Sequence, residues 1–258
     1  MSTTILGPDG KSRCRWCNAA PEFLDYHDTE WGFPVSNDRR LFEKLSLEGF
    51  QSGLSWRTIL AKRENFRAAF HDFDFDRIAR FTQRDLDRLL KDAGIVRHRG
   101  KIAAVVNNAQ RARELVEREG SLAAFIWRYE PDQKQLAKPQ TVSTSAESLA
   151  LSKDLKKLGW KFVGPTTMYA FMQAMGLIND HVADCVIRSK IESARKRFKR
   201  PGGCHRTRSM KKYCRGRACP TRYLYRARHA SPLHHSGMDA IQFSPATGIW
   251  PASNEKAP

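Results

Sequence analysis

The chain has 258 residues, with 45 Lys and Arg against 27 Asp and Glu, and a formal net charge of +18. This length suits one large domain or two small ones. The charge is uneven: residues 186–258 hold 17 of the basic and 3 of the acidic side chains, which leaves residues 1–185 near +4. High positive charge is typical of nucleic-acid-binding proteins, but most of it lies in the tail and says little about the front part.

The sequence lacks the features of secreted and membrane proteins. The N-terminus, MSTTILGPDGKSR, has no apolar core of a signal peptide, and no run approaches the length of a membrane span. The chain has 6 cysteines. In a protein of this length without a secretion signal, they indicate a reducing, cytoplasmic setting, where cysteines are metal ligands or free thiols.

Residues 1–12 are predicted to be a flexible leader, and residues 13–190 a single all-helical domain. Apolar residues recur at helical spacing after residue 38, with a break around Gly53. Thr82 with Asp85 is typical of a helix start. The helices are predicted over residues 38–70, 85–94, 101–120, 122–129, 148–159 and 160–180.

Three further segments complete the predicted organisation. Residues 131–143 read as a polar loop, and Thr144 with Glu147 resembles a capping box that starts the next helix. No stretch shows the alternation of a strand. Residues 191–258 form a basic tail rich in Arg, Gly and Pro without apolar periodicity, and we expect most of it to be disordered.

Four residues form a candidate metal site. Cys14 and His27 lie near the N-terminus, and His181 and Cys185 belong to HVADC, where a spacing of four places both on one face of a helix. Two sulfurs and two imidazoles suit a closed tetrahedral zinc site with a structural role. The alternative is that some of these are structural filler, and Cys17 competes with Cys14 as a ligand.

Glu48 is the candidate recognition residue. It sits on an otherwise apolar helical face, eight residues before Trp56. The aromatic residues Trp16, Tyr26 and Trp31 precede it in the chain and are expected to lie near it in the fold. A carboxylate among aromatic faces suits a flat cation that carries an amine. The alternative is that Glu48 pairs with a neighbouring Arg or Lys on the surface.

The segment GWKFVGPTTMYAFMQAMG is a candidate DNA-backbone contact. A turn at Gly164 and Pro165 leads directly into a helix at Thr166 and Thr167, and backbone N–H groups at a helix start bind phosphate. The alternative is an ordinary turn between two helices. DAGIVRHRGK offers weaker candidate phosphate contacts through its basic side chains, Arg97, Arg99 and Lys101.

Taken together, these segments resemble the 3-methyladenine DNA glycosylase I family of constitutive bacterial enzymes. The matching motifs run in order from about residue 13 to 185: RCRW, YHDTEWGFP, LFEKLSLEGFQSGLSW, KRENFRAAF, DAGIVRHRGKI and STSAESLALSKDLKKLGWKFVGPTTMYAFMQAMGLINDHVADC. The resemblance implies an all-α helix-hairpin-helix glycosylase fold with a zinc-binding extension that ties the N-terminus to the end of the domain.

The resemblance also implies roles for individual residues. By it, the zinc ligands are Cys14, His27, His181 and Cys185; the base-binding residues are Trp16, Tyr26, Glu48 and Trp56, with Glu48 also the catalytic residue; and the DNA-binding residues are Gly53 and Leu54 in the loop that plugs the duplex, with Gly164, Pro165, Thr166 and Thr167 in the hairpin. Phe23 stands where the family often has tyrosine, and nothing after about Cys185 has a counterpart.

The implied activity is a monofunctional base-excision repair glycosylase, a hydrolase of N-glycosyl bonds. It would flip N3-methyladenine out of alkylated double-stranded DNA and leave an abasic site. Because the methylated base is cationic, its glycosidic bond is already weakened, so one carboxylate without a lysine nucleophile suffices. Such an enzyme is expected to be a monomer and not to associate with a membrane.

Two rival functions and two open roles accompany this expectation. The rivals are a non-catalytic helix-hairpin-helix DNA-binding protein and a zinc-stabilised helical interaction protein. Asp180 is a competing catalytic carboxylate, or else a helix N-cap. The basic tail is expected to add nonspecific, salt-sensitive DNA affinity.

Overall fold

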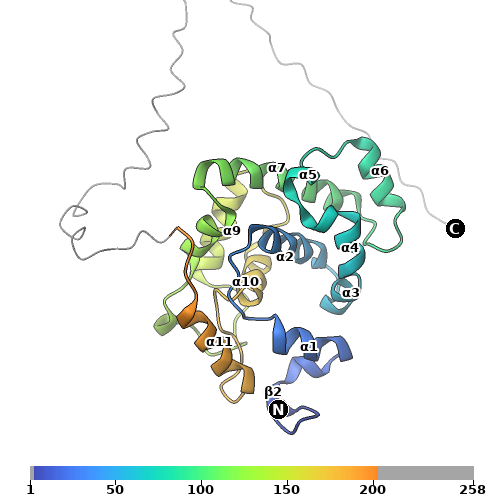
Figure 1. The fold of residues 1–258 in the computed structure, drawn as a ribbon. Coiled ribbons are helices and arrows are strands. Elements are labelled where there is room, and N and C mark those ends of the chain that lie inside the picture. The colour runs from blue at the N-terminus through green and yellow to red at the C-terminus, as the bar shows by residue number, and fades with distance from the viewer. Residues whose placement is uncertain (1–2, 203–258) are drawn as a thin grey trace, which may run out of the picture. The chain divides into compact units, whose positions relative to one another are not determined.

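The computed structural model of the protein describes residues 3–202, which are almost entirely helical (Figure 1). The first half contains β1 (Thr4–Leu6), β2 (Ser12–Cys14), a 3-10 turn (Arg15–Asn18), α1 (Pro21–Thr29), α2 (Asp38–Gln51), α3 (Trp56–Ala61), α4 (Arg63–Ala69), a second 3-10 turn (His71–Phe73), α5 (Phe75–Ile78) and α6 (Gln83–Lys91). The predicted predominance of helix is confirmed.

The second half is built in the same way. It contains α7 (Arg99–Glu119), α8 (Leu122–Ile126), 3-10 turns at Trp127–Tyr129 and Gln133–Gln135, α9 (Ala146–Lys157), α10 (Pro165–Ala174) and α11 (Val186–Arg197). None of the helices between residues 3 and 202 combines the length and apolar character that a membrane crossing requires.

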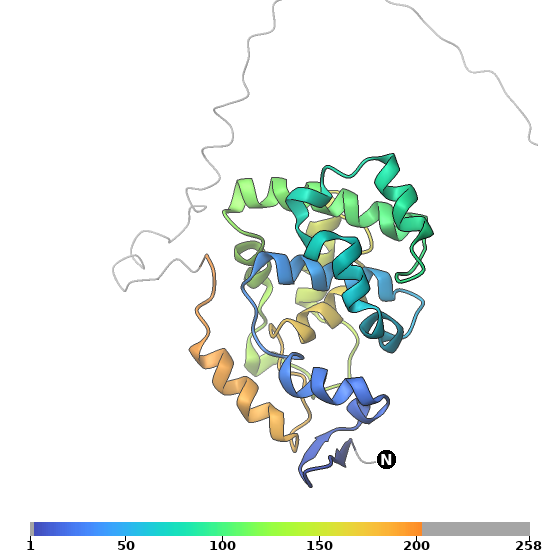
Figure 2. The same ribbon diagram turned by 45° about the vertical axis from the view of Figure 1, so that its right-hand side comes forward.

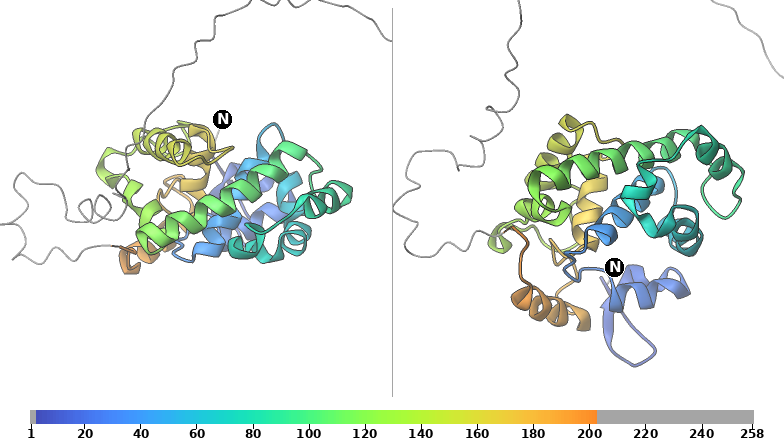
Figure 3. Two further views of the ribbon diagram at one scale, coloured as in Figure 1. Left: turned by 90° about the horizontal axis from the view of Figure 1, so that it is seen from above. Right: turned by 45° about the horizontal axis from the view of Figure 1, so that its top comes forward.

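The core lies around α2, which packs against α10, α7 and α8. The long helix α7 crosses this layer and also contacts α5 and α6, while α9 and α10 form a tightly packed pair (Figure 3). A run of phenylalanine rings fills the space between α2 and α4, with Phe50 and Phe66 at 4.6 Å and Phe70 and Phe73 at 5.6 Å between ring centroids. This core leaves α1, β1 and β2 at one end of the domain (Figure 1).

The helix boundaries follow local signals read from the sequence. The predicted break at Gly53 is confirmed, because Gly53 has a positive φ of 76° between α2 and α3. Thr82 and Asp85 form the predicted capping box of α6. The prediction for α9 is wrong by one residue: its capping box joins Ser145 and Ser148, whose hydroxyl groups bond the opposing backbone N–H groups, in place of Thr144 and Glu147.

The N-terminal segment differs from the predicted flexible leader. Thr4–Leu6 pairs antiparallel with Ser12–Cys14, and the turn between them closes with a hydrogen bond from Gly10 N to the Gly7 carbonyl. The buried Arg13 guanidinium fixes this hairpin, since it bonds Asp9 at 2.6 Å and Asp28 of α1 at 2.9 Å. Arg13, the first residue of the predicted helical domain, therefore anchors the segment that was predicted to be a flexible leader.

The C-terminal boundary of the domain also differs from the expected residue 190. Helix α11 continues to Arg197 because one of its faces is buried, with Ile187, Ile191 and Arg195 at most 5% exposed. Arg195 forms an ion pair with Glu130 at 2.6 Å. Figure 2 shows α11 beside the N-terminal hairpin, in agreement with contacts between α11 and β2. The rest of the predicted disordered tail, residues 203–258, lies outside the described residues.

The segment after α1 folds tightly onto the end of α10. Gly32 N donates to the Ala174 carbonyl and Val35 N to the Met175 carbonyl. Gly176 allows this approach: its φ is 77°, and a Cβ there would lie 2.5 Å from Pro34 N. The backbone of the two segments thus leaves no room for a side chain at this position.

We predict that Gly176→Ala destabilises the domain far more than Gly120→Ala. Both glycines have positive φ, but a Cβ at Gly120 meets nothing within 4 Å. Gly120→Ala should therefore cost only the strain of a left-handed residue, about 1–2 kcal/mol, while Gly176→Ala adds a clash with backbone. Urea unfolding of both variants measures this difference, and equal losses would contradict the assigned close approach.

Candidate functional site

The predicted carboxylate Glu48 is buried, at 5% exposure, between side chains of three helices. Glu48 lies on α2, Tyr26 comes from α1 and Trp56 is the first residue of α3. The Tyr26 and Trp56 rings lie 5.4 Å apart between centroids. The predicted grouping of Glu48 with Tyr26 and Trp56 is therefore present in the structure.

A lysine occupies the centre of this group. The Lys44 ammonium lies 2.8 Å from Glu48 Oε1, one helical turn away on α2, and donates to the Tyr26 hydroxyl at 2.8 Å. It also lies over the Trp56 ring, 3.5 Å from the centroid, and 5.2 Å from the Tyr26 centroid. Glu48 is thus paired with a lysine, as the alternative interpretation expected, but the pair is buried instead of lying on the surface.

Burial and charge act in opposite directions on these groups. Burial tends to lower the pKa of Lys44, but the Glu48 charge and the hydrogen bonds to Glu48 and Tyr26 raise it above its usual value. Burial raises the pKa of the Tyr26 phenol. At neutral pH Lys44 is therefore an ammonium ion and Tyr26 a neutral phenol.

The cavity beside Lys44 is small. Its free volume is about 30 Å³, room for a water molecule or two. The lining residues are Tyr26, Glu30, Arg40, Glu43, Lys44, Leu47, Trp56, Arg63, Arg67 and Met175. On the rim, Glu30 is paired with Arg63 at 2.8 Å and Glu43 with Arg67 at 2.7 Å.

Trp16 is not one of the described residues that line this pocket. Its ring contacts Tyr26 edge-on at 6.4 Å, Trp31 at 5.0 Å and His27 at 5.3 Å between centroids. Phe23, the position where a tyrosine was expected, packs on the same indole at 5.8 Å. Trp16 therefore supports the pocket wall and links it to a second cluster.

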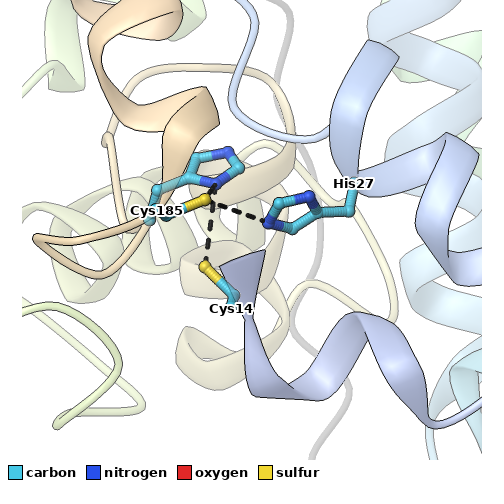
Figure 4. Close-up of side chains that lie close together, drawn as sticks. Cys14, His27 and Cys185 are labelled. Atoms are coloured by element: carbon cyan, nitrogen blue, oxygen red, sulfur yellow. Dashed lines mark hydrogen bonds between the residues drawn. The ribbon is translucent and has the colours of Figure 1, made fainter. Parts of the chain in front are cut away.

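This second cluster brings together the four predicted metal ligands. Cys14, His27, His181 and Cys185 are all buried, and their ligand atoms lie within 4.8 Å of one another. Figure 4 shows the labelled side chains of Cys14, His27 and Cys185 converging from β2, α1 and the start of α11. Residues more than 150 positions apart in the chain thus meet at one point.

The distances within the cluster match a tetrahedral metal site. Cys185 Sγ lies 3.5 Å from His27 Nε2 and 3.4 Å from His181 Nδ1, and Cys14 Sγ lies 3.7 Å from His181 Nδ1. The bond lengths of a tetrahedral zinc ion require ligand separations of roughly 3.3 to 3.8 Å. The four residues could therefore hold a metal ion with little movement.

Hydrogen bonds outside the cluster orient both imidazoles. His27 Nδ1 lies 2.7 Å from Asp28 Oδ1, and His181 Nε2 lies 2.9 Å from the Trp31 carbonyl oxygen. Both partners are acceptors, so these nitrogens carry the protons and the opposite nitrogens present lone pairs to the sulfurs. Such outer partners are characteristic of histidine metal ligands.

The two thiols are strongly coupled. The hydrogen bond between them lowers the pKa of Cys185, which the two histidines also favour as a thiolate, and raises the pKa of Cys14. A metal cation would favour both as thiolates. Cys17 lies outside the cluster and packs with Ala20 and Phe23, so among the described residues it does not compete for this position.

The predicted helix over HVADC is absent from the structure. His181–Cys185 forms a turn in which Cys185 N donates to the Val182 carbonyl at 3.0 Å, and α11 begins only at Val186. The turn places both ligand atoms on one side, as the predicted helix would have done. Val182 N also points at Cys14 Sγ, at 3.5 Å, which a continuous helix would prevent.

Two exposed loops lie close to the pocket. Gly53 and Leu54 form the tip between α2 and α3, and Leu54 is 41% exposed. The second loop, residues 158–164, joins α9 to α10, and Gly164 is the N-cap of α10 with Pro165, Thr166 and Thr167 in its first turn. The second loop lies against α2, since a Cβ on Gly49, the neighbour of Glu48, would lie 3.3 Å from Phe162 Cβ.

Helix α7 holds both loops in place. Asn108 donates to the Lys161 carbonyl and accepts from Lys161 N, both at 2.9 Å. The Lys101 ammonium donates to the Phe50 and Ser52 carbonyls at 2.9 and 2.5 Å. Lys101 is buried, so its expected role as a phosphate contact is wrong: it caps the end of α2 below the Gly53 tip.

Comparison with known proteins agrees with this geometry. The family model described as methyladenine glycosylase matches residues 16–189. The chain is 47% identical over 177 residues to the DNA-3-methyladenine glycosylase 1 of Escherichia coli (strain K12), covering 67% of this chain and 95% of that protein. It is 45% identical to the DNA-3-methyladenine glycosylase of Haemophilus influenzae, covering 67% and 96%.

The chain belongs to the methyladenine glycosylase family. Among solved structures, a crystal structure of 3-methyladenine DNA glycosylase I matches with a TM-score of 0.64 at 47% identity, covering 67% of this chain and 98% of that chain. A tyrosine-to-phenylalanine variant of such an enzyme in complex with 3-methyladenine matches with a TM-score of 0.64 at 37% identity, covering 68% and 97%. The predicted family resemblance is confirmed.

Asp180, the competing carboxylate of the sequence analysis, is held by side chains and backbone of this methyladenine glycosylase domain. Its carboxylate is buried and accepts from Gln140 N at 3.0 Å and from Gln173 Nε2 at 2.5 Å. Burial raises its pKa. It caps no helix, because Cys185 is the N-cap of α11, and it does not line the Lys44 cavity. Asp180 anchors the 131–143 loop.

The sequence interpretation missed Lys44, Asp28 and Gln140. Lys44 precedes Glu48 by four residues on a helix, a spacing at which side chains meet, so the pair was visible in principle. Asp28 follows His27 directly, and no sequence pattern indicated that it would bond the imidazole. Gln140, which donates to Cys14 Sγ at 3.2 Å, comes from a loop without periodicity.

We predict that Lys101→Met loosens the Gly53 tip in this methyladenine glycosylase. Two buried carbonyl oxygens would lose a charged donor, a loss worth roughly 2 kcal/mol. Hydrogen exchange at the amides of residues 51–54 should accelerate, and urea unfolding should show the stability loss. Unchanged exchange at these amides would contradict the assigned role of Lys101.

Proposed function

We propose that this protein is a 3-methyladenine DNA glycosylase that removes the alkylated base from double-stranded DNA by hydrolysis and leaves an abasic site. The observation that carries the proposal is the buried Glu48 carboxylate, whose partner Lys44 also contacts the Tyr26 hydroxyl and the Trp56 ring. The family membership and the complex of a related enzyme with 3-methyladenine support it.

The pocket chemistry fits a cationic base with an exocyclic amine. An aromatic face attracts a flat cation, and a desolvated carboxylate accepts hydrogen bonds from an amine. The position of Lys44 supports this reading, because a cation already contacts Glu48, Tyr26 and Trp56 at once. A neutral, unmodified adenine would gain less from the same contacts.

The reaction requires little acid catalysis. When water adds to the sugar C1′, the bonding electrons of the N-glycosidic bond pass to the cationic base, which leaves neutral, and the water releases a proton. A pocket that prefers the cation stabilises the ground state and does not by itself accelerate this step. We therefore assign base selection to Glu48 and the aromatics, and acceleration to positioning and to distortion of the DNA.

Lys44 is not the nucleophile of a covalent mechanism. Such a role needs the neutral amine, whereas Glu48 and Tyr26 hold the amine as an ammonium ion and raise its pKa. The single buried lysine of the pocket therefore fits a monofunctional glycosylase, which uses water and forms no Schiff base.

The DNA-binding surface is proposed to include the two loops described above. Entry of a base into the pocket requires it to leave the stack, and the exposed Leu54 at the Gly53 tip could fill the gap. The α9–α10 pair with its Gly164-Pro165 turn would act as the helix-hairpin-helix motif. The N–H groups of Thr166 and Thr167 at the start of α10 suit a phosphate.

Zinc is proposed as the resident metal of the Cys14, His27, His181 and Cys185 cluster. Two thiolates and two imidazoles at tetrahedral separations suit Zn²⁺, and four protein ligands leave no position for a substrate. The metal would supply structure, not chemistry: it would fix α1, which carries Tyr26, against the turn before α11. Metal binding of this kind contributes directly to folding stability.

We predict that Glu48→Gln impairs release of 3-methyladenine from methylated duplex DNA. The amide keeps the shape but loses the charge-assisted hydrogen bonds, so kcat/KM should fall roughly 10- to 100-fold. Chromatography of the freed bases measures this. Glu117→Gln, an exposed residue on α7, is the matched control and should leave kcat/KM unchanged.

Two results would contradict the proposed function. Wild-type protein that binds methylated duplex DNA and frees no 3-methyladenine would identify a non-catalytic DNA-binding protein. A Glu48→Gln variant with wild-type rate and base selectivity would remove Glu48 from the site.

A second prediction concerns the metal. Cys185→Ser should reduce bound zinc from about one ion per chain to almost none, lower the unfolding temperature and weaken base release by loosening α1. Cys17→Ser, a buried thiol outside the cluster, is the matched control and should retain the metal. Elemental analysis and thermal unfolding check both variants, and full zinc content in Cys185→Ser would refute the ligand assignment.

A further inference from the structure

The Lys44 ammonium stands where the proposed substrate would place its positive charge. It contacts three of the four residues predicted to bind the base: Glu48 at 2.8 Å, the Tyr26 hydroxyl at 2.8 Å and the Trp56 ring at 3.5 Å from the centroid. In the protein without substrate, the cation site of the pocket is therefore filled by a side chain of the protein itself.

A purine cannot enter while Lys44 keeps this position. The free volume beside the ammonium is about 30 Å³, which holds a water molecule or two and not a bicyclic base. The Trp56 face that a flat base would stack on is the face that Lys44 covers. Entry of the base thus requires the lysine to move.

The surroundings offer the ammonium another position. The carboxylates of Glu30 and Glu43 line the rim of the same cavity, and each is paired with an arginine. Four rotatable bonds separate the ammonium from the α2 backbone, so the side chain can swing while the helix stays in place. A displaced ammonium would therefore reach a rim that holds the Glu30 and Glu43 carboxylates together with the guanidinium groups of Arg40, Arg63 and Arg67.

A purely structural role explains this arrangement less well. Buried ion pairs are costly to desolvate, and apolar residues of similar size are often as stabilising. Lys44 and Glu48 are buried charged side chains on α2, and the Lys44 ammonium lies beside the Tyr26 and Trp56 rings. Perturbed, buried charges that gather in a cavity mark functional sites more often than structural ones.

We propose that Lys44 is a displaceable internal cation that competes with the alkylated base for Glu48 and the Trp56 face. This inference rests on the proposed function. The cationic base displaces the ammonium when it enters. After hydrolysis the free base is neutral and loses its advantage at Glu48, so the ammonium returns and helps to expel the product. Lys44 thereby occupies the pocket whenever the alkylated base is absent and limits product inhibition.

The test compares binding of two free bases to the full-length protein by calorimetry. One probe is neutral 3-methyladenine, and the other is 3,9-dimethyladeninium, in which an N9 methyl group replaces the sugar and keeps the positive charge. In Lys44→Met the dissociation constants of both probes should fall about tenfold, the effect of removing one competing cation–π contact. Lys190→Met, an exposed lysine on α11, is the charge-matched control and should change neither.

The neutral probe separates displacement from simple repulsion. If Lys44 stays beside the bound base, its removal should strengthen binding of the cation alone, because an ammonium does not repel a neutral base. Tighter binding of the neutral probe therefore supports displacement, while unchanged binding of that probe overturns it. Lys44→Arg, which restores a larger cation, should bind both probes no more tightly than wild type.

A second measurement needs no variant. Labelling of wild-type protein with acetic anhydride, read by mass spectrometry, should modify Lys44 faster when 3-methyladenine is saturating, and should modify Lys190 equally with and without the base. Slower or unchanged labelling of Lys44 overturns the proposal.

Failure of this inference is distinguishable from failure of the proposed function. Wild-type protein that frees no 3-methyladenine from methylated DNA ends the proposed function. Wild-type protein that frees the base, with unchanged affinity for neutral 3-methyladenine in Lys44→Met, ends only the role of Lys44.

Discussion

A carboxylate shut inside an aromatic pocket cannot remain without a positive partner, and this constraint shapes the site. Removing a lone charge from water costs several kcal/mol, and Glu48 is only 5% exposed. In the free protein the partner is Lys44, held between Glu48 and the Trp56 ring. The same need for a cation suits an alkylated base, whose charge distinguishes it from every normal base of DNA.

One wall of the pocket is held by a contact between the two ends of the described domain. Tyr26 forms one wall and lies on α1, whereas Glu48 and Trp56 belong to the central layer. The neighbour of Tyr26 is His27, whose imidazole joins Cys14, His181 and Cys185. The cluster therefore holds Tyr26 in place through its neighbour His27 on α1. The Trp16 ring contacts both Tyr26 and His27 and so packs the pocket wall against the cluster.

The helices, and the grouping of Glu48 with Tyr26 and Trp56, could largely be predicted from the sequence. Apolar spacing and glycine breaks depend on local rules, so α2, α6 and α7 and the turn at Gly53 appeared where expected. Glu48 was recognisable because a carboxylate on an apolar face is costly. The same reasoning did not decide whether its partner would be solvent, a surface arginine or a buried lysine, because a spacing of four lets two side chains meet but does not determine whether the pair is buried.

Features that depend on distant contacts escaped prediction. The leader forms a hairpin because Arg13 reaches Asp28 of α1, and α11 extends to Arg197 because Arg195 meets Glu130. The turn at His181 replaces a helix because Val182 N approaches Cys14 Sγ, 168 residues earlier in the chain. None of these partners is near in sequence, so no local pattern announces them.

The most direct test of the central claim is a crystal structure of the protein with 3-methyladenine and duplex DNA that carries a stable abasic-site analogue. The account predicts the base stacked on Trp56, its exocyclic amine at hydrogen-bond distance from Glu48, and the Lys44 ammonium displaced toward the rim. A base bound elsewhere, with Lys44 and Glu48 still paired over the indole, would contradict it.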